Sequence, residues 1–176
     1  VTYRELYRRV LGIDPLRDGI DSLRNALGNV RIDADGLERD DWLDLLMTHR
    51  LQPAFPADRM IAVHDWPASQ AALARIRDDD PPVAERFELY LGPVELANGY
   101  HELTDADEQH QRFDADLDAR QRRGQALPAI DERLIAALQH GMPACAGVAV
   151  GVDRQMMVLS QQPETADVIA FGFARA

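Results

Sequence analysis

The sequence has a single cysteine and no apolar run long enough to cross a membrane. A single cysteine, Cys145, excludes an internal disulfide, which is typical of a reducing compartment. A transmembrane helix needs about 20 consecutive apolar residues, and no stretch approaches that length. The first residues, Val1 to Glu5, lack the apolar segment of a signal peptide. These absences predict a cytoplasmic protein with no membrane partner.

Excess positive charge is also missing, because 30 acidic residues outnumber 19 basic ones and give a net charge of -11. Broad binding to phosphate backbones needs clustered basic side chains. The small arginine clusters, at residues 8–9 and 120–123, fit solvated helix faces or helix ends, where cations are favourable. The composition therefore argues against a broad nucleic-acid surface. With 46% hydrophobic residues, the 176-residue chain is long enough for one compact domain with a core.

Several motifs of well-known chemistry are absent. There is no Walker-type phosphate loop and no dinucleotide fingerprint. No serine or cysteine sits in a nucleophile elbow, and no cysteine pairs are available for zinc. His101-Glu102 lacks the second histidine of a zinc-protease helix, and His64, His110 and His140 lie in unrelated contexts. Any chemistry must therefore come from other residue types.

Capping signals and apolar spacing predict helices in the first third of the chain, at residues 2–12, 21–27 and from Asp40 or Asp41 onward. A strand is expected at 60–64, a helix at 68–77 and a loop at 78–82. Two strands, 85–91 and 94–103, are joined by Gly92-Pro93 at hairpin spacing.

The rest of the chain predicts more helices and one further strand. The helices are expected at 104–123, capped by Thr104, at 131–140 and at 152–159. An apolar strand is expected at 145–151, and a short final strand or extended segment at 168–173. A hairpin, then helices, then one more strand indicates an α+β fold, with a mainly antiparallel sheet flanked by helices rather than βαβ units.

Three carboxylates recur at seven-residue spacing on the hairpin, at Glu88, Glu95 and Glu102. Strand alternation places Asn98, Tyr100 and Glu102 on one face. Glu95 joins them only if a β-bulge intervenes, for which Gly99 or Ala97-Asn98 leaves room. Paired carboxylates can bind Mg²⁺ with substrate phosphates, and a carboxylate beside an aromatic ring can hold an ammonium group. The alternative is an exposed sheet face dotted with glutamates.

A second group of residues lies at Gly147-Val148-Ala149-Val150-Gly151-Val152-Asp153-Arg154. Positions 147, 149 and 151 are small and share one face of the expected strand, so a flat ring can lie against that backbone. Arg154 falls in the first turn of the next helix, where the dipole disfavours a cation. An anion bound there would explain the arginine. The alternative is tight packing on a helix, with Arg154 in a structural ion pair.

Together, the run from Phe87 to Asp105 and the later run from Gly147 to Arg154 resemble class II lysyl-tRNA synthetases. They resemble still more closely the truncated relatives of those enzymes, ligases that attach β-lysine to a lysine of elongation factor P. Glu-Leu-Ala-Asn-Gly-Tyr-His-Glu-Leu in register with Gly-x-Ala-x-Gly-x-x-Arg is the specific part of the match. The similarity covers nearly the whole chain and is weakest before residue 60.

The resemblance implies a role for each matching residue. Glu88 and Glu95 would coordinate Mg²⁺ on ATP, and Leu96 and Gly151 would contact ATP. Arg154 would make a catalytic contact to the γ-phosphate. The residues that would contact the amino acid are Asn98, Tyr100, Glu102 and Ala149. Glu102 would hold the side-chain ammonium of lysine or β-lysine. The implied chemistry is attack of a carboxylate on the α-phosphorus of ATP, driven by positioning and charge neutralisation.

Within this resemblance, two positions distinguish the ligases that modify elongation factor P from the enzymes that charge tRNA. The tRNA-charging enzymes normally have glycine where this chain has Ala149, and usually serine at His101. The elongation factor P ligases have alanine at the position of Ala149. We therefore expect β-lysine and elongation factor P as partners, with lysine and tRNA as the alternative.

The resemblance does not extend to motifs 1 and 2, which build the dimer interface and grip the α-phosphate. Both are expected upstream of Val1, so residues 1–176 would be the C-terminal portion of a catalytic domain that is a homodimer at full length. Residues 1–55 would be a mostly helical insertion, and 56–176 the hairpin and motif 3 region. Alone, the chain is expected to be inactive. The non-enzymatic alternative is a binding module that keeps the lysine and adenylate pocket.

Overall fold

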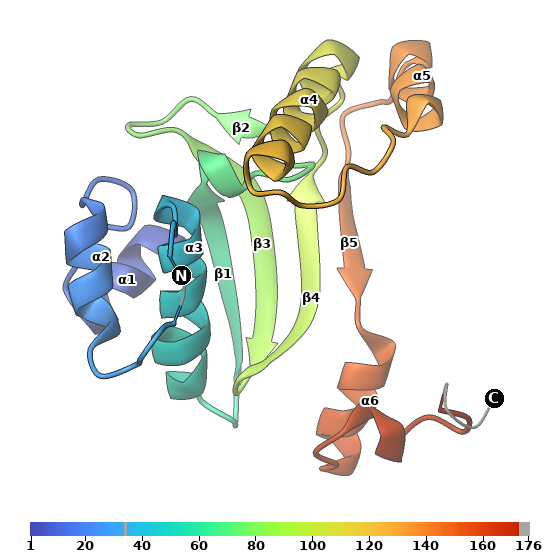
Figure 1. Cartoon of the computed structure of the whole chain (residues 1–176). Coiled ribbons are helices and arrows are strands. Elements are labelled where there is room, and N and C mark those ends of the chain that lie inside the picture. Colours follow the sequence, from blue (N-terminus) through green and yellow to red (C-terminus); the bar gives the residue numbers. More distant parts are fainter. Residues whose placement is uncertain (34, 173–176) are drawn as a thin grey trace.

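The computed structural model describes residues 1–33 and 35–172. Its elements are, in chain order, α1 (Tyr3–Leu11), α2 (Ile20–Leu27), α3 (Arg39–Leu46), the π-helical turn η1 (Met47–Leu51), the 3-10 turn η2 (Gln52–Ala54), β1 (Met60–Pro67), the 3-10 turn η3 (Ala68–Gln70), β2 (Ile76–Arg77), β3 (Val83–Leu91), β4 (Val94–His101), α4 (Ala106–Arg122), α5 (Glu132–His140), β5 (Ala146–Val150), α6 (Val152–Ser160) and the 3-10 turn η4 (Thr165–Asp167). Helices flank an antiparallel sheet, so the predicted α+β fold is confirmed (Figure 1).

The sheet has five strands, with the path β1-β3-β4-β5 and the short β2 paired to β3. Every pairing is antiparallel. β3 and β4 form the predicted hairpin, and Gly92 takes a φ of 53° in its turn, a conformation that glycine adopts without strain. β5 lies beside β4, with Gly147 opposite Tyr100. The hairpin and the glycine-containing strand are therefore neighbours (Figure 1).

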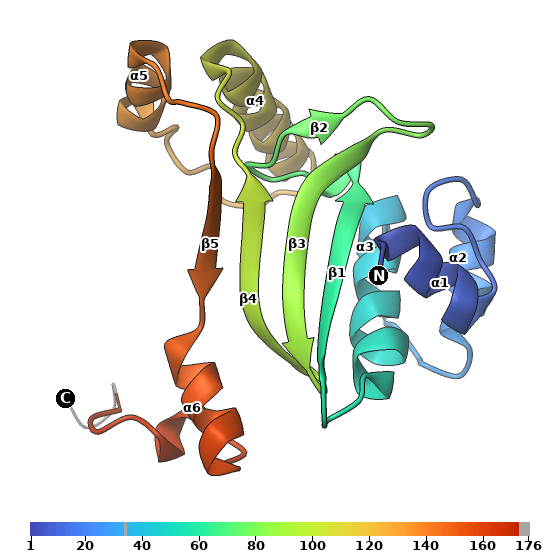
Figure 2. The same ribbon diagram turned by 180° about the vertical axis from the view of Figure 1, so that it is seen from behind.

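The hydrophobic core lies between the N-terminal helices and the β1–β3 part of one sheet face. Tyr3 and Tyr7 of α1 are fully buried with their hydroxyls 2.7 Å apart, and the Tyr7 hydroxyl donates to the Leu43 carbonyl at 2.7 Å. Val63 and Trp66 of β1 close the core from the sheet. Figure 2 shows the sheet from the side opposite to α3, so the strands are nearest the viewer and α3 lies beyond them. α1 and α2 lie beside β1 in the same view. The core thus supports one half of the sheet and leaves the β4–β5 half to polar residues.

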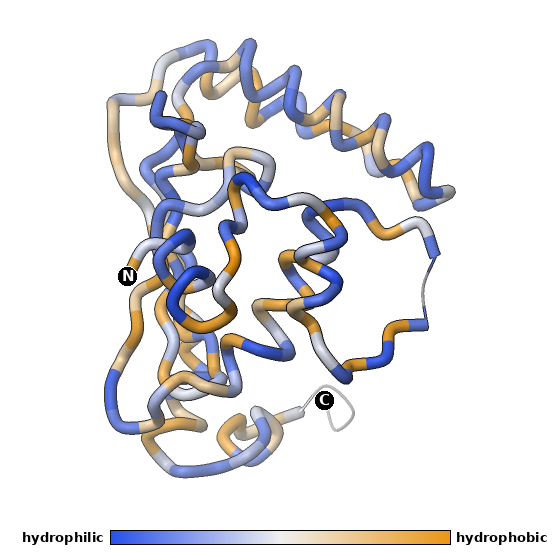
Figure 3. The backbone as a smooth tube through the Cα atoms, turned by 90° about the vertical axis from the view of Figure 1, so that its left-hand side faces the viewer, coloured by the Kyte–Doolittle hydropathy of each residue, from blue (hydrophilic) through white to orange (hydrophobic). Residues whose placement is uncertain are grey.

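The helices of the C-terminal part lie at the two ends of the strands (Figure 1). α4 and α5 lie at one end, and α6 follows β5 at the other. α4, the long helix at the top of Figure 3, is hydrophilic along most of its length. Arg123, just after α4, donates to Asp41 at 3.1 and 3.0 Å and to Glu38 at 2.9 Å. This ion pair links α4 to the start of α3. Within the described residues, no helix combines the length and apolar character that spanning a membrane requires.

The helix predicted at residues 68–77 is wrong. Only Ala68–Gln70 forms a 3-10 turn, and Ile76–Arg77 is strand β2. Ala72 has a φ of 49°, a left-handed conformation that ends a helix. The Arg75 N–H then donates to the His101 carbonyl at 2.8 Å. Pairing with the sheet therefore overrides the helical propensity of an alanine-rich segment.

One predicted helix cap and one predicted segment also differ from the structure. The cap of α4 is Asp105 rather than Thr104, since the Asp105 carboxylate accepts from the Glu108 N–H at 2.9 Å, and a carboxylate is favourable at a helix N-terminus. Residues 168–172 form no strand, because the Ile169 N–H bonds back to the Thr165 carbonyl at 3.3 Å and prolongs the preceding turn. Phe173, the last residue of that prediction, lies outside the described residues.

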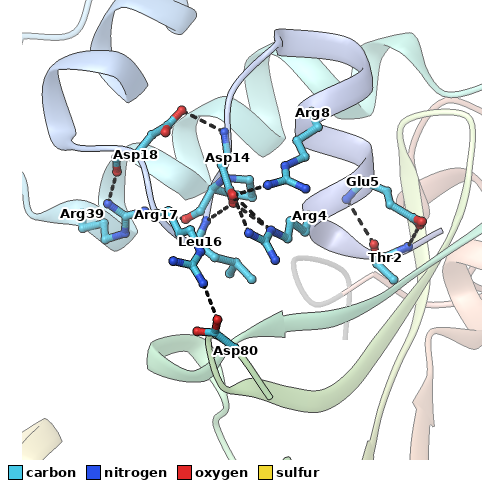
Figure 4. Close-up of polar contacts among 11 residues, drawn as sticks. Thr2, Arg4, Glu5, Arg8, Asp14, Leu16, Arg17, Asp18, Arg39 and Asp80 are labelled. Carbon is cyan, nitrogen blue, oxygen red and sulfur yellow. Dashed lines mark hydrogen bonds and ion pairs between the residues drawn. The ribbon is translucent and has the colours of Figure 1, made fainter. Parts of the chain in front are cut away.

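One carboxylate holds the loop between α1 and α2. The Asp14 side chain, 11% exposed, receives hydrogen bonds from Arg4 at 2.7 Å and Arg8 at 2.6 Å (Figure 4). The Leu16 N–H donates to it at 3.1 Å. Burial by itself would raise the pKa of Asp14, but the bonds from Arg4 and Leu16, helped by Arg8, outweigh burial and hold the pKa below its usual range.

We expect Asp14→Asn to lower the free energy of unfolding by about 1.5–3 kcal/mol at pH 7, because it removes hydrogen bonds to a charged group. Since the folded-state pKa is depressed, the native protein binds fewer protons than the unfolded chain. The contribution is therefore complete above the unfolded pKa of about 3.9 and is lost as the pH falls through the folded pKa.

Urea unfolding of the wild type and the variant at neutral and acidic pH measures this difference. Asp80→Asn is the matched control, because Asp80 pairs with Arg17 at 2.8 Å but is 92% exposed, so its loss should change stability by less than about 1 kcal/mol. A difference for Asp14→Asn that persists unchanged at acidic pH would contradict the assignment of the effect to the carboxylate charge.

Candidate active site

The predicted site residues of the hairpin lie on one face of the sheet. Direct cross-strand neighbours share a face, and Glu88 lies opposite Asn98, while Tyr90 lies opposite Glu95. Glu95 reaches this face because β4 carries one extra residue, Leu96, between the partners of Leu89 and Tyr90. The predicted bulge is therefore present, but at Leu96 instead of at Gly99 or Ala97-Asn98.

The four residues predicted to contact an amino acid line one cavity of about 310 Å³. Asn98 lies opposite Ala149, and Tyr100 lies opposite Gly147, across the β4–β5 pairing. Glu102 follows β4, and its N–H donates to the Cys145 carbonyl at 3.0 Å. The remaining lining residues are Leu73, Gly147 and Val148. The cavity thus presents an acid, an amide and an aromatic ring above small residues.

Gly147 makes room for the carboxylate of Glu102. A Cβ placed on Gly147 would overlap Glu102 Oε1, so no other residue type fits without moving that side chain. The sequence suggested that the small residues of this strand accept a flat ring. At position 147 the structure shows a different reason for glycine, which is to let Glu102 lie directly against the β5 backbone.

Asn98 has a buried acceptor that the described residues do not satisfy. Its Oδ1 is buried and has no hydrogen-bond partner there. A buried polar atom without a partner is costly, and this one belongs to a residue that lines the cavity. A bound amino group would reach this acceptor only after a rotation of the Asn98 side chain toward the cavity.

A second cavity, of about 500 Å³, opens on the same face and is lined by Glu88 and Glu95. Both oxygens of Glu88 are engaged: Arg86 Nη2 donates to Oε1 at 2.5 Å, and the Tyr90 hydroxyl donates to Oε2. Arg86 is itself held in place, since it lies over the Trp66 ring at 4.3 Å and donates to a backbone carbonyl at 2.9 Å. Glu88 is therefore a fixed carboxylate in a rigid polar network.

The pKa of Glu88 is raised above its usual range. Burial is the main cause, and the neighbouring Glu95 carboxylate adds to it, while Tyr90 and Arg86 act in the opposite direction. A cation placed between the two carboxylates would favour their ionised forms. The site is therefore electrostatically suited to a positive charge.

Arg154 lies beside Glu95 rather than in solvent alone. Its Nη1 is 3.0 Å from the Glu95 carbonyl and 3.4 Å from Glu95 Oε2. Arg154 is in the first turn of α6, which begins after Gly151, and the Gly151 N–H donates to the Leu96 carbonyl at 2.9 Å. Leu96 as a whole is only 7% exposed, and its carbonyl is the group that the start of α6 contacts. The residues predicted to contact ATP thus surround the β4 bulge and the start of α6.

Sequence reasoning missed several residues of this face. Arg86 and Tyr90 complete the surroundings of Glu88, and Gln70 and Leu73 line the cavities from the segment mistaken for a helix. Strand alternation was the available signal for the first two, because positions 86, 88 and 90 share a face. No local signal marks Gln70 and Leu73, because their positions depend on the turn around Ala72.

Glu88 and Glu95 fit one mode of metal binding. In the part of the chain that the structure describes, no three His, Cys, Asp or Glu side chains gather into a metal site. Mg²⁺ is usually held by one or two carboxylates together with substrate phosphates rather than by an all-protein cage. Two carboxylates next to an arginine that can turn to a phosphate match that pattern.

We expect Gly147→Ala to destabilise the protein by no more than about 1 kcal/mol, because the added methyl group displaces the Glu102 carboxylate, the end of a side chain that can rotate away. The same substitution made in a Glu102→Ala background should cost less, since the side chain that it displaces is gone. Thermal and urea unfolding of the four proteins gives the coupling, which should be at least about 0.5 kcal/mol for residues in contact. Additive effects would show that the two residues do not meet.

Comparison with known proteins identifies the family of the chain. Residues 30–175 match the family described as tRNA synthetases class II (D, K and N). Over its whole length the chain is 44% identical to the elongation factor P–(R)-β-lysine ligase of Pectobacterium atrosepticum and 46% identical to that of Yersinia enterocolitica. It spans 55% of the length of each relative. The chain therefore belongs to the class II tRNA synthetases of the D, K and N group.

Proposed function

We propose that this chain is part of an ATP-dependent ligase that activates β-lysine as an adenylate and transfers it to a lysine of elongation factor P. The observation that carries the proposal is the single sheet face on which Asn98, Tyr100, Glu102 and Ala149 line one cavity and Glu88 and Glu95 line the next. We assign the substrate ammonium group to the first cavity, and the triphosphate, with Mg²⁺ and Arg154, to the side of the second at which Glu95 lies. Glu88, which lines the second cavity, lies opposite Asn98, which lines the first.

The proposed reaction has two steps. In the first, the substrate carboxylate attacks the α-phosphorus of ATP, the bond from that phosphorus to the bridging oxygen breaks, and pyrophosphate leaves. In the second, the amine of the acceptor lysine attacks the carbonyl carbon of the adenylate and AMP leaves. No protein nucleophile is needed, so the side chains act by positioning and by balancing charge.

Glu102 would bind the substrate's side-chain ammonium, and Asn98 Oδ1 would accept from its other amino group. Arg154 would leave Glu95 for the γ-phosphate, which frees the Glu95 carboxylate. Mg²⁺, held by Glu88 and Glu95 together with the phosphates, would supply the remaining charge neutralisation. Arg86 would keep Glu88 oriented throughout, because its own contacts to Trp66 and the backbone do not involve ligands.

Three observations support elongation factor P, rather than tRNA, as the acceptor. The relatives at 42–46% identity are named for elongation factor P and (R)-β-lysine, and Ala149 replaces the glycine expected of tRNA-charging enzymes. The net charge of -11 gives no broad surface for tRNA. We further propose that residues 1–176 alone do not form the adenylate and that the full gene product is a cytoplasmic homodimer.

The test uses the full gene product with radiolabelled β-lysine or lysine, ATP and either purified elongation factor P or lysine tRNA. We expect label to enter elongation factor P and to require ATP. Label in tRNA but not in the protein would replace the proposed function with tRNA lysylation. Absence of pyrophosphate exchange with both amino acids would favour a binding module.

Arg154→Ala in the full gene product should reduce adenylate formation about ten- to a hundredfold, because it removes a charge-assisted contact worth about 1.5–3 kcal/mol. Its ion pair with Glu95 joins side chains that are 51% and 34% exposed, so stability should change by less than about 1 kcal/mol. Pyrophosphate exchange and thermal unfolding together separate the two roles. Full exchange activity with reduced stability would leave only the structural ion pair.

Ala149→Gly should improve the use of α-lysine relative to β-lysine. Ala149 faces Asn98 across the strands, so its methyl group narrows the cavity beside the residue proposed to bind an amino group. One methyl group is worth about 0.8 kcal/mol, or roughly a fourfold change. The quantity to measure is the ratio of kcat/KM for the two substrates, because a general loss of folded protein cancels in it. A ratio that stays constant, or moves toward β-lysine, would contradict the assignment.

A further inference from the structure

Leu73 is a large apolar side chain in the lining of the cavity that contains Glu102. It is 39% exposed and lines the cavity that also contains Asn98, Tyr100 and Glu102. Its chain segment arrives through the left-handed turn at Ala72 rather than on a strand of the hairpin. Exposed leucines are common on protein surfaces, but this one is fixed in position by its backbone.

The backbone at and just after Leu73 is bonded to the end of β4 and to the residues that follow it, including Leu103 next to Glu102. The Leu103 N–H donates to the Leu73 carbonyl at 2.9 Å, and the Arg75 N–H donates to the His101 carbonyl at 2.8 Å. Ala74 forms an antiparallel bridge with Glu102. These bonds therefore hold the backbone of Leu73 in a defined position relative to the backbone of Glu102.

A residue of the polar helix α4 closes this segment from the other side. Arg112 Nη1 donates to the Ala72 carbonyl at 3.0 Å and to the Ala74 carbonyl at 2.8 Å. Its Nε and Nη2 bind Glu108 one turn earlier, at 3.1 and 2.5 Å. Arg112 is only 19% exposed. One guanidinium thus bridges the carbonyls on both sides of Leu73.

We propose that Leu73 is a specificity-determining residue that packs on the methylene chain of the amino acid, and that Arg112 is the positioning residue that holds it there. This inference rests on the proposed function. A lysine-type substrate carries an apolar chain between its carboxylate end and its terminal ammonium. With Glu102 binding the ammonium and Asn98 the amino group, the chain between them needs an apolar wall. Leu73 and the Tyr100 ring supply that wall together with Val148, since Gly147 and Ala149 are too small.

Chain length follows from this arrangement. Because the Leu73 backbone is held beside Glu102, a substrate that reaches the carboxylate also passes the leucine. A substrate one methylene shorter that reaches Glu102 covers Leu73 less completely, and one methylene in an apolar contact is worth roughly tenfold or more in discrimination. Leu73 thus discriminates by chain length, while Glu102 selects the charge.

The test measures pyrophosphate exchange by the full gene product with β-lysine, with lysine and with homologues one methylene shorter. Leu73→Ala should raise KM for the preferred amino acid about tenfold and reduce discrimination against the shorter homologue. The KM for ATP and kcat should stay within about twofold. Leu73→Met, which restores apolar bulk, should recover most of the loss. Because Leu73 is partly exposed, thermal unfolding should change little.

Arg112→Gln should raise KM for the amino acid in the same direction and leave KM for ATP unchanged. Arg120→Gln is the matched control, because it removes an i,i+4 ion pair to Asp116 from the same helix, at 2.8 Å, without touching the Leu73 segment. An unchanged amino-acid KM in Leu73→Ala would overturn the inference, as would an equal rise in KM for ATP. A wild type that uses no lysine-type amino acid would overturn the proposed function and this inference together.

Discussion

Strand β4 contains one residue more than the part of β3 that pairs with it, and this extra residue decides which side chains meet. Without Leu96 in the bulge, alternation would send Glu95 to the face opposite Glu88 and Asn98. With it, the carboxylates of Glu88 and Glu95 share a face, and Arg154 reaches Glu95 from α6. A bulge is a local change in register, yet here it brings together groups from two strands and a helix.

Charge balance explains why such a face is stable. Buried carboxylates are costly unless they are paired and hydrogen-bonded. Glu88 is paired with Arg86 and Glu95 with Arg154, so each acid has its own arginine. The two arginines differ, however, because Arg86 is 17% exposed and fixed on Trp66, whereas Arg154 is 51% exposed. The fixed pair orients a carboxylate, and the exposed pair can exchange its partner for a phosphate at low cost.

Much of this arrangement follows from the sequence, and the remainder depends on contacts distant in the chain. Hairpin spacing and strand alternation predict the shared face of Asn98 and Tyr100, and the need for a bulge follows from the parity of Glu95. The position of the bulge does not, because it depends on how Leu96 and Ala97 are buried against other elements. Residues 68–77 have helical composition, but bonds to His101 and Leu103 hold them extended. The role of Gly147 is visible only once Glu102 is placed against it.

The two halves of the sheet are held by different forces, and this division suits a binding site. Beneath β1 and β3, stacked tyrosines and leucines form a close-packed core that tolerates little movement. Beside β4 and β5, the walls are held by hydrogen bonds, such as those from Arg112 to the segment around Leu73. Hydrogen bonds hold these walls in place without filling the cavity. The cavity therefore stays open next to the close-packed core. The apolar half therefore supplies stability, and the polar half can keep an unsatisfied acceptor such as Asn98 Oδ1 ready for a ligand.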